Sequence, residues 1–345
     1  MANLTSIEWT DVSWQVTRGC SRVSPGCGGA RGEGSCYAEG IASRFSGPGQ
    51  VFEGFAVRGK GWTRKVSPLP QNLAEPLSWK KPRRVFVNSM SDLFHEDVPN
   101  EYIAAVFGVM AACPQHTFQV LTKRAERMAA WFEWLASARQ PWPTQGPPGW
   151  LCHEHARRQA HGDVRWMRRE DTWPLPNVWI GVSVEDQKRA DERIPHLLRV
   201  PAAVRFLSCE PLIGPVDLGR VAFPDEGVAH LDALRGAYFC DGLNEPRRTP
   251  RIDWVIVGGE SGLDARPFDL AWARSIVAQC READVACFVK QLGARPEIEE
   301  GAWFARDARG VRADIPLALR DRKGGDMAEW PEDLRIRQWP AGGAR

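Results

Sequence analysis

Three cysteines in a glycine-rich loop are the residues best suited to chemistry in this sequence. Cys20, Cys27 and Cys36 fall within seventeen residues, with six residues between the first pair and eight between the second. Thiolates are the usual protein ligands of zinc and of iron–sulfur clusters. Three thiolates leave one position of a metal centre open. The loop therefore favours a three-thiolate cradle for an iron–sulfur cluster, with one iron left for a small molecule.

Two other interpretations of the loop stay open: a zinc site, or three unrelated cysteines. A structural zinc site normally has four protein ligands. The nearest candidates for a fourth, Cys152, His153 and His155, lie in a distant insertion. Glycines at several positions of the loop would let its backbone wrap a cluster closely. These glycines are at positions 26, 28, 29, 32 and 34.

Composition limits where this chain is expected to work. It has 345 residues, nine cysteines and a formal net charge of +2. The first residues lack both the basic segment and the apolar run of a secretory signal, and the longest apolar run, 103–113, is too short to span a bilayer. We therefore expect a cytoplasmic protein whose cysteines serve metal or catalytic chemistry rather than disulfides. The balanced charge neither requires nor excludes nucleic-acid binding.

Beyond the loop, strand-like and helix-like segments alternate along the chain. Strands are expected within 7–16, 84–92, 117–123, 178–183, 204–211, 254–260 and 286–290. Helices are expected at 37–45, 100–112 with Asn100 as the N-cap, 125–136, 187–198 and 270–283. The alternation predicts an α/β fold: a complete or partial (β/α) barrel of mainly parallel strands. An open doubly wound sheet is the alternative, although Gly258-Gly259-Glu260 does not fit the G-x-G-x-x-G dinucleotide pattern.

Two insertions and a tail interrupt this pattern. The barrel is predicted over residues 1–295, with insertions at about 137–176 and 214–250, and residues 296–345 form an extension without clear periodicity. Cys152 to His155, in the first insertion, is predicted to be a solvated loop rather than a metal site. Tryptophans and arginines around it suit stacking on bases and contacts with phosphates. A capping insertion with a hydrophobic underside would explain the same composition.

Polar residues stand where several of the predicted strands end. In parallel α/β folds, ligands bind at the carboxyl ends of the strands. Six such strand ends together favour a shared active site. The residues are Asn88, Ser89, Ser91, Asp92, Thr122, Lys123, Ser183, Glu185, Ser208, Glu210, Gly258, Gly259, Glu260, Lys290 and Gln291.

The cysteine loop placed before a βα alternation resembles the radical S-adenosylmethionine enzymes, whose usual motif is C-x3-C-x2-C. A closer resemblance is to an uncharacterised phage-associated family related to them, with a pattern near G-C-x6-C-x2-C-Y-A-E. This chain has Gly19-Cys20, Cys27 and Cys36-Tyr37-Ala38-Glu39, with six extra residues between its second and third cysteines. The resemblance covers most of residues 5–295. It continues in segments 85–95, 118–124, 206–212, 254–262 and 288–291.

The resemblance implies a cofactor, a reaction and a partner. Cys20, Cys27 and Cys36 would hold a [4Fe-4S] cluster whose free iron binds S-adenosylmethionine. One electron from a reductant protein would cleave the cofactor, and the 5′-deoxyadenosyl radical would abstract hydrogen from a substrate. A nucleobase or nucleic acid is the candidate substrate class. The alternative is a zinc- or cluster-stabilised protein that binds nucleic acid or a partner protein without catalysis.

The resemblance also suggests roles for the strand ends. Asp92 would accept from the amino group of the cofactor, and Ser183 and Glu185 would bind its ribose. The full set of predicted cofactor-binding residues is Ser89, Ser91, Asp92, Ser183, Glu185, Gly258, Gly259 and Glu260. The predicted catalytic residues, facing cofactor or substrate, are Lys123, Glu210 and Lys290. For each residue, a structural hydrogen bond or salt bridge is the competing role.

Overall fold

The computed structural model describes residues 3–28, 36–137, 148–160, 164, 173–223, 228–240, 245–298, 317 and 319–341. The chain divides into two compact units. Unit 1 contains Met1–Val23, Ala38–Val182 and Arg199–Arg205. Unit 2 contains Ser24–Tyr37, Ser183–Leu198 and Phe206–Arg345. The division passes through the cysteine loop and assigns Cys20 to unit 1, and Cys27 and Cys36 to unit 2.

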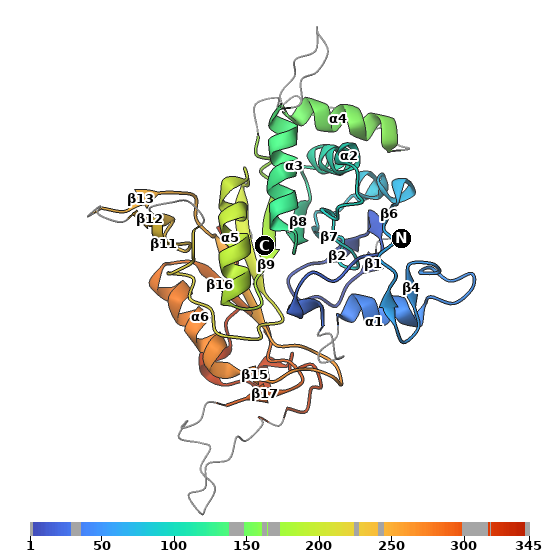
Figure 1. Ribbon diagram of the computed structural model, residues 1–345. Coiled ribbons are helices and arrows are strands. Elements are labelled where there is room, and N and C mark those ends of the chain that lie inside the picture. Colours follow the sequence, from blue (N-terminus) through green and yellow to red (C-terminus); the bar gives the residue numbers. More distant parts are fainter. Residues whose placement is uncertain are drawn as a thin grey trace, which may run out of the picture. The chain divides into compact units, whose positions relative to one another are not determined.

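The predicted fold class is confirmed. The protein is α/β, with the mainly parallel strands and intervening helices of a partial (β/α) barrel (Figure 1). Among the residues that the structure describes, no helix is both long enough and apolar enough to cross a membrane.

Unit 1 carries strands in the order β1-β2-β7-β8-β9. Their bounds are β1 Asn3–Leu4, β2 Val12–Trp14, β7 Arg84–Val87, β8 Thr117–Thr122 and β9 Val178–Ser183. The pairings β2–β7, β7–β8 and β8–β9 are parallel, and β1 is antiparallel to β2. All residues of β2 and β9 are buried. Such runs are expected where helices cover both faces of a parallel sheet.

Two helices link the strands of unit 1, α2 (Asn100–Ala111) and α3 (Ala125–Ser137). The prediction that Asn100 is the N-cap of the first helix is wrong, because Pro99 occupies that position and Asn100 is already helical. The Asn100 side chain has another use: its Oδ1 accepts a hydrogen bond from Arg127 Nη2 at 2.6 Å.

The first insertion contains a helix, α4 (Pro148–Gln159), so the prediction of a solvated loop at Cys152 to His155 is wrong. Helix α4 packs on α2, and Gly108 makes the approach possible, since a Cβ there would lie 2.1 Å from the carbonyl oxygen of Cys152 (Figure 1). Burial raises the pKa of the Cys152 thiol above its ordinary value. The capping interpretation therefore holds for α4. His161 and Trp166 lie outside the described residues.

Short elements surround the cysteine loop and fill the connection at 50–80. They are η1 (Pro25–Cys27), α1 (Tyr37–Arg44), η2 (Pro70–Asn72) and η3 (Glu75–Ser78). Two small antiparallel pairs are formed by β3 (Thr17–Arg18) with β6 (Ser67–Pro68), and by β4 (Ala56–Val57) with β5 (Gly61–Trp62). The β3–β6 pair leads the chain directly into Gly19 and Cys20.

Unit 2 carries the parallel strands β10 (Val204–Cys209), β14 (Trp254–Gly258) and β16 (Ala286–Gln291), in that order. Its helices are α5 (Gln187–Arg199) and α6 (Leu270–Glu282). Asp269 caps α6 by accepting a hydrogen bond from the Ala271 backbone N–H. The second insertion forms a small antiparallel sheet of β11 (Val228–Asp232), β12 (Ala237–Cys240) and β13 (Arg247–Arg248).

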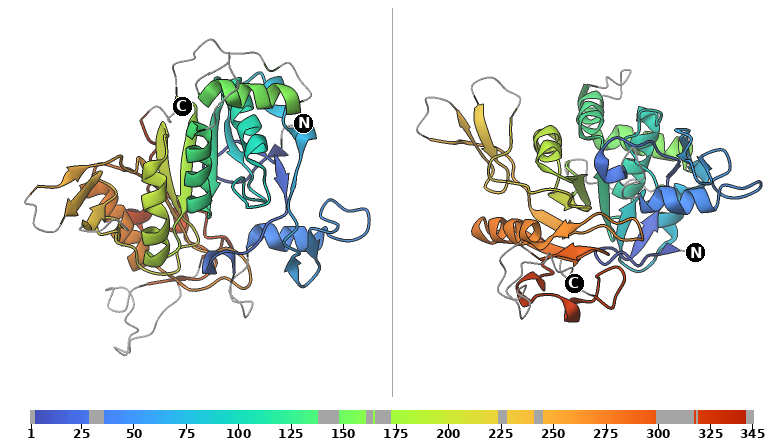
Figure 2. Two further views of the ribbon diagram at one scale, coloured as in Figure 1. Left: turned by 45° about the horizontal axis from the view of Figure 1, so that its top comes forward. Right: turned by 60° about the horizontal axis from the view of Figure 1, so that its bottom comes forward.

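Part of the C-terminal extension adds to the core of unit 2. Its described elements are β17 (Pro296–Glu297), η4 (Met327–Glu329) and η5 (Glu332–Leu334), and β17 pairs with the upstream strand β15 (Phe268–Asp269). The described part of the extension is red in Figure 2. The Val289 backbone donates to Ile336 and the Trp254 indole donates to Gln338. Trp330 is 2% exposed. These residues therefore pack along β14 and β16.

Candidate functional site

In unit 1, the residues after β7 hold the segment that leads to Cys20. Asn88 has φ 60°, a left-handed backbone conformation that asparagine adopts more readily than most residues. Its Oδ1 accepts hydrogen bonds from the backbone N–H groups of Val16 and Thr17 at 2.8 and 3.2 Å. Ser91 also bonds Thr17, through both the hydroxyl and the carbonyl of that residue. The predicted strand-end residues therefore fix the chain three residues before Cys20.

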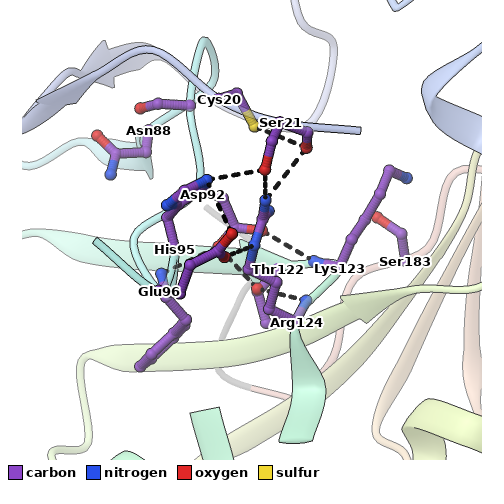
Figure 3. Close-up of polar contacts among 12 residues, drawn as sticks. Cys20, Ser21, Asn88, Asp92, His95, Glu96, Thr122, Lys123, Arg124 and Ser183 are labelled. Atoms are coloured by element: carbon purple, nitrogen blue, oxygen red, sulfur yellow. Dashed lines mark hydrogen bonds and ion pairs between the residues drawn. The ribbon is translucent and has the colours of Figure 1, made fainter. Parts of the chain in front are cut away.

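Arg124 holds the residue that follows Cys20. Its Nη2 donates to the carbonyl oxygen of Ser21 at 3.1 Å and to the Ser21 hydroxyl at 2.8 Å. The Cys20 thiol lies 3.6 Å from the same Ser21 carbonyl oxygen. Figure 3 shows the guanidinium of Arg124 between Ser21 and Asp92, to which its Nη1 donates at 3.1 Å. Arg124 is 9% exposed, so its pair with Asp92 is buried. The pair holds residues 20–22, which we call the Cys20 turn.

Asp92 is occupied by the protein itself. Its Oδ1 accepts from the Phe94 backbone at 3.0 Å and from the Thr122 hydroxyl at 2.7 Å. Its Oδ2 accepts from the Lys123 backbone at 3.2 Å and from Arg124. The carboxylate is 5% exposed and both of its oxygens are engaged. Asp92 therefore positions Arg124 in this structure. Its contact with the amino group of the cofactor stays a prediction.

The charges around the Arg124–Asp92 pair favour an ionised arginine and a neutral histidine. Burial on its own lowers the pKa of Arg124, but the charges of Asp92, Cys20 and Glu96 together raise it above the ordinary value. Burial, followed by the charge of Arg124, lowers the pKa of His95. His95 Nε2 lies 2.8 Å from the Ser21 hydroxyl. A permanent cation therefore lies beside the Cys20 turn.

Glu39 in α1 ties the other flank of the loop to the same unit. Its Oε2 accepts from Arg22 Nε at 2.9 Å, and its Oε1 accepts from the Trp62 backbone at 2.9 Å. Gly61 is needed beside it, because a Cβ there would lie 2.1 Å from Glu39 Oε1. Glu39, the last residue of the C-Y-A-E pattern, is therefore an anchor between Arg22 and β5.

In unit 2, Glu185 holds residues 24–27, which we call the Cys27 turn. The Ser24 hydroxyl donates to Glu185 Oε1 at 2.8 Å, and Arg193 Nη1 donates to Oε2 at 2.9 Å. A Cβ at position 26 would lie 2.3 Å from Glu185 Cγ, so only glycine fits there. Glu185 is fully buried. In the structure Glu185 positions the Cys27 turn. Its contact with the cofactor ribose, which the resemblance implies, stays a prediction.

A second arginine–carboxylate pair grips the same turn. Arg266 Nη1 donates to the carbonyl oxygen of Pro25 at 2.9 Å. The guanidinium is itself held by both carboxylate oxygens of Glu260, at 2.9 and 3.0 Å. Glu260 is 7% exposed. Of the predicted cofactor-binding residues, Glu185 and Glu260 thus both reach the Cys27 turn, one directly and one through Arg266.

The strand ends of unit 2 bring two predicted catalytic residues together. Lys290 Nζ lies 2.5 Å from Glu210 Oε1, and both side chains are partly exposed. Gly259 allows a close approach of the chain itself, since a Cβ there would lie 2.5 Å from the Leu292 carbonyl oxygen. At Gly258, by contrast, a Cβ would make ordinary contacts of 3.4 Å. Glu210 and Lys290 therefore form a polar pair at one edge of the unit 2 strands.

The other predicted residues have contacts of their own. Lys123 belongs to unit 1, where its backbone bonds Asp92. Ser89 accepts a hydrogen bond from the side chain of Gln15 at 2.7 Å. Ser183 is 3% exposed, and its carbonyl oxygen accepts from Arg193 at 2.8 Å.

The residue pattern did not single out Ser21, Ser24, Arg124 or Arg266 as site residues. For Arg124 a signal was present, since it closes the matching segment 118–124. Arg193 had no local signal, because it looks like one more charged residue in an amphipathic helix. These arginines are paired with carboxylates far along the chain, and spacing in the sequence does not reveal such pairs.

The donor chemistry of the loop suits a metal cluster. All nine cysteines are thiols rather than disulfides. Cys27 is buried, while Cys20 and Cys36 are half-buried. Within the described residues, which omit 29–35, no group of three or more histidine, cysteine, aspartate or glutamate side chains is gathered closely enough to hold a metal ion. The fit to a [4Fe-4S] cluster therefore depends on the kind and number of donor atoms in the loop, which are three cysteine thiols, and not on their positions.

Comparison with known proteins assigns a family. Residues 4–321 match the model of a family described as "Protein of unknown function (DUF5131)". No match was found among curated proteins or among solved structures. The matched region includes the three cysteines, the anchors of both turns and the Glu210–Lys290 pair. The chain therefore belongs to the DUF5131 family of proteins of unknown function.

Proposed function

We propose that this protein is a radical S-adenosylmethionine enzyme in which Cys20, Cys27 and Cys36 hold a [4Fe-4S] cluster. The observation that carries the proposal is the anchoring of the loop. The Cys20 turn is held by the buried Arg124–Asp92 pair of unit 1. The Cys27 turn is held by the buried Arg193–Glu185 pair and by the partly exposed Arg266–Glu260 pair of unit 2. Metal ligands typically depend on such surrounding contacts for their orientation.

When bound, the cluster would supply the electron that breaks the carbon–sulfur bond of S-adenosylmethionine, which gives methionine and a 5′-deoxyadenosyl radical that takes a hydrogen atom from the substrate. The three thiolates are the protein's contribution to the cluster. Arg124 places a buried positive charge beside the Cys20 turn, which offsets part of the negative charge of the thiolates. Cys27 is buried, which would help to keep water from this ligand.

The Glu210–Lys290 pair is the candidate acid–base group. It stands at strand ends, where ligands bind in parallel α/β folds. Each side chain is only about one-sixth exposed, and the ammonium donates directly to the carboxylate. A pair of this kind can hold a proton at Lys290 Nζ and return it to a bound substrate. Lys123, in unit 1, is proposed to contact cofactor or substrate.

Two further features belong to the proposal. An electron-donor protein supplies the reductant, and the protein works in the cytoplasm, where cysteines stay reduced. The proposed substrate class is a nucleobase or nucleic acid.

Anaerobic purification tests this function. We expect a brown protein that contains iron and sulfide in near-equal amounts and that cleaves S-adenosylmethionine when a strong reductant is added. One equivalent of zinc in a colourless protein would overturn the proposal. A cluster without cleavage would instead support the non-catalytic alternative.

A further inference from the structure

Residues 41–65 of unit 1, which we call the basic lobe, carry an unusual concentration of positive charge. The lobe has five exposed cationic side chains and one acidic residue, Glu53, which amounts to a net charge of +4; the whole chain carries +2. The Glu53 carboxylate also accepts a hydrogen bond from the Gly49 backbone at 2.7 Å. The cations are Arg44, Arg58, Lys60, Arg64 and Lys65. The lobe therefore attracts polyanions although the chain as a whole is nearly neutral.

Aromatic and apolar side chains lie among these cations. Phe45 is 47% exposed and Val51 is 58% exposed. Phe52 and Phe55 are half-buried, and both carry cations over their rings. The Arg18 guanidinium lies 6.0 and 5.8 Å from the two ring centres, and Lys65 Nζ lies 5.0 Å from that of Phe55. Phe45 therefore offers an exposed ring among cations, which is typical of surfaces that bind single-stranded nucleic acids.

The lobe has a defined structure that is fixed next to the cysteine loop. Three of its glycines, at 49, 54 and 59, have φ between 74° and 76°, which sets its tight turns. Gly19 packs against it so closely that a Cβ would lie 2.0 Å from the Lys65 carbonyl oxygen. On its other side, Glu39 bonds the Trp62 backbone. Figures 1 and 2 show the loop beside β4 extending away from the strands of unit 1.

We propose that the basic lobe binds single-stranded nucleic acid, with phosphates on its cations and a base stacked on Phe45. An anionic membrane is disfavoured, because interfacial helices gather their cations on the polar face of one amphipathic helix. Helix α1 has eight residues, and four of the five cations of the lobe lie outside it.

This binding site deepens the proposed function, and the chemistry performed on a bound strand rests on that function. The lobe touches the chain at Gly19, the residue before Cys20, through the close approach of Gly19 to the Lys65 carbonyl oxygen. A strand bound on the lobe therefore lies beside the Cys20 turn.

Binding can be measured by fluorescence anisotropy on the anaerobically purified full chain. The probes are labelled single-stranded DNA and RNA of about 20 nucleotides, titrated at several KCl concentrations. We expect binding that weakens as salt rises. The plot of log K against log salt has a negative slope. Replacing Arg44, Arg58 and Lys60 by Gln should make this slope shallower by about 2, because each lost phosphate contact removes roughly 0.7 from its magnitude. Phe45→Ala should weaken binding about 5- to 150-fold, the range for loss of one stacked base.

The triple variant Lys188→Gln, Arg247→Gln and Arg248→Gln is the matched control. These three cations belong to unit 2 and are exposed. The control should bind as tightly as the natural protein. A basic-lobe triple variant that keeps the full salt slope overturns the proposal, and so does a control that loses as much affinity as the basic-lobe variant.

Vesicles containing phosphatidylserine provide a second probe. Binding to these vesicles without binding to either oligonucleotide overturns the proposal in favour of a membrane. Iron content and thermal unfolding are measured on the same samples, so a variant that does not fold is recognised and Phe45→Ala then decides. If the natural protein contains iron and cleaves S-adenosylmethionine but binds no oligonucleotide, the basic-lobe proposal fails while the proposed chemistry stands.

Discussion

The Cys20 turn and the Cys27 turn are both anchored by arginine–carboxylate pairs, but the two turns differ in which member of a pair contacts them. In unit 1 the arginine contacts the turn, since Arg124 donates to Ser21, and Asp92 stands behind it. In unit 2 the carboxylate contacts the turn, since Ser24 donates to Glu185, and Arg193 stands behind it. The Cys27 turn is also contacted by a cation, because Arg266 donates to the Pro25 carbonyl oxygen. The Cys20 turn therefore has a buried cation next to it, whereas the Cys27 turn has a fully buried anion together with a cation. The additional anion is the difference between the two turns.

The largest expected effect comes from the cysteines themselves. Cys20→Ala, Cys27→Ala and Cys36→Ala should each reduce the iron content of anaerobically purified protein to near zero, because a cluster held by three thiolates loses a ligand. Cys240→Ala, in β12, is the control and should keep full iron. Iron retained at the natural level in any one of the three variants would remove that cysteine from the ligand set.

The next largest effect is expected at Glu185. Glu185→Ala leaves Arg193 without its carboxylate, and the two side chains are 0% and 5% exposed. Breaking a buried ion pair on one side costs about 3–5 kcal/mol. Urea unfolding should show this loss as a lower midpoint. A change below about 1 kcal/mol, far under that range, would mean that the Cys27 turn does not depend on this pair.

Arg124→Gln should lower the free energy of unfolding less than Glu185→Ala does. Its main effect should be the loss of a positive charge beside the Cys20 turn. Asp92 keeps three donors after this change, so we expect a loss of about 1–3 kcal/mol, the range for a hydrogen bond lost in the interior. Loss of the cation should make the cluster harder to reduce, because net charge near a cluster helps to set its potential. Electron paramagnetic resonance during a redox titration checks this. Arg274→Gln, at an exposed salt bridge in unit 2, should leave the potential unchanged.

The smallest expected effect is on the pH dependence of the free energy of unfolding, through His95 beside the Cys20 turn. Burial and the charge of Arg124 lower the pKa of His95, while Glu96, Asp97 and Asp92 oppose the shift. A histidine with a lowered pKa in the folded state takes up its proton more readily once unfolded. Stability should therefore fall as the pH drops below 6.5, the ordinary value, towards the folded pKa.

His95→Gln tests this dependence, since it keeps a polar partner for Ser21 but does not titrate. Urea unfolding at about pH 7.5 and about pH 5.5, on either side of the ordinary histidine pKa, should show a smaller loss of stability in the variant than in the natural protein. Equal losses would exclude His95 as the source.

Much of the fold could be predicted from residue patterns. The buried runs at Arg84–Val87, Val178–Ser183 and Trp254–Gly258 have the continuous apolar character of parallel strands, and all became strands. The short α4 was missed, because its tryptophan, histidines and arginines hide a narrow apolar face at Leu151, Cys152 and Ala156. This apolar face becomes evident only in the structure, where it packs against Gly108 of α2.

The sequence by itself determined the alternation of strands and helices, the three-thiol loop and the polar character of the strand ends, because all of these depend on residue type and local spacing. Only the tertiary structure decided what the polar residues do. It gave Asp92, Glu185 and Glu260 arginine partners, which occupy carboxylates that the pattern left open for a cofactor. It also paired Glu210 with Lys290, eighty positions apart. The physical reason is that a buried carboxylate must be paired with a charge or with donors, and that partner is chosen by the fold rather than by neighbours in the chain.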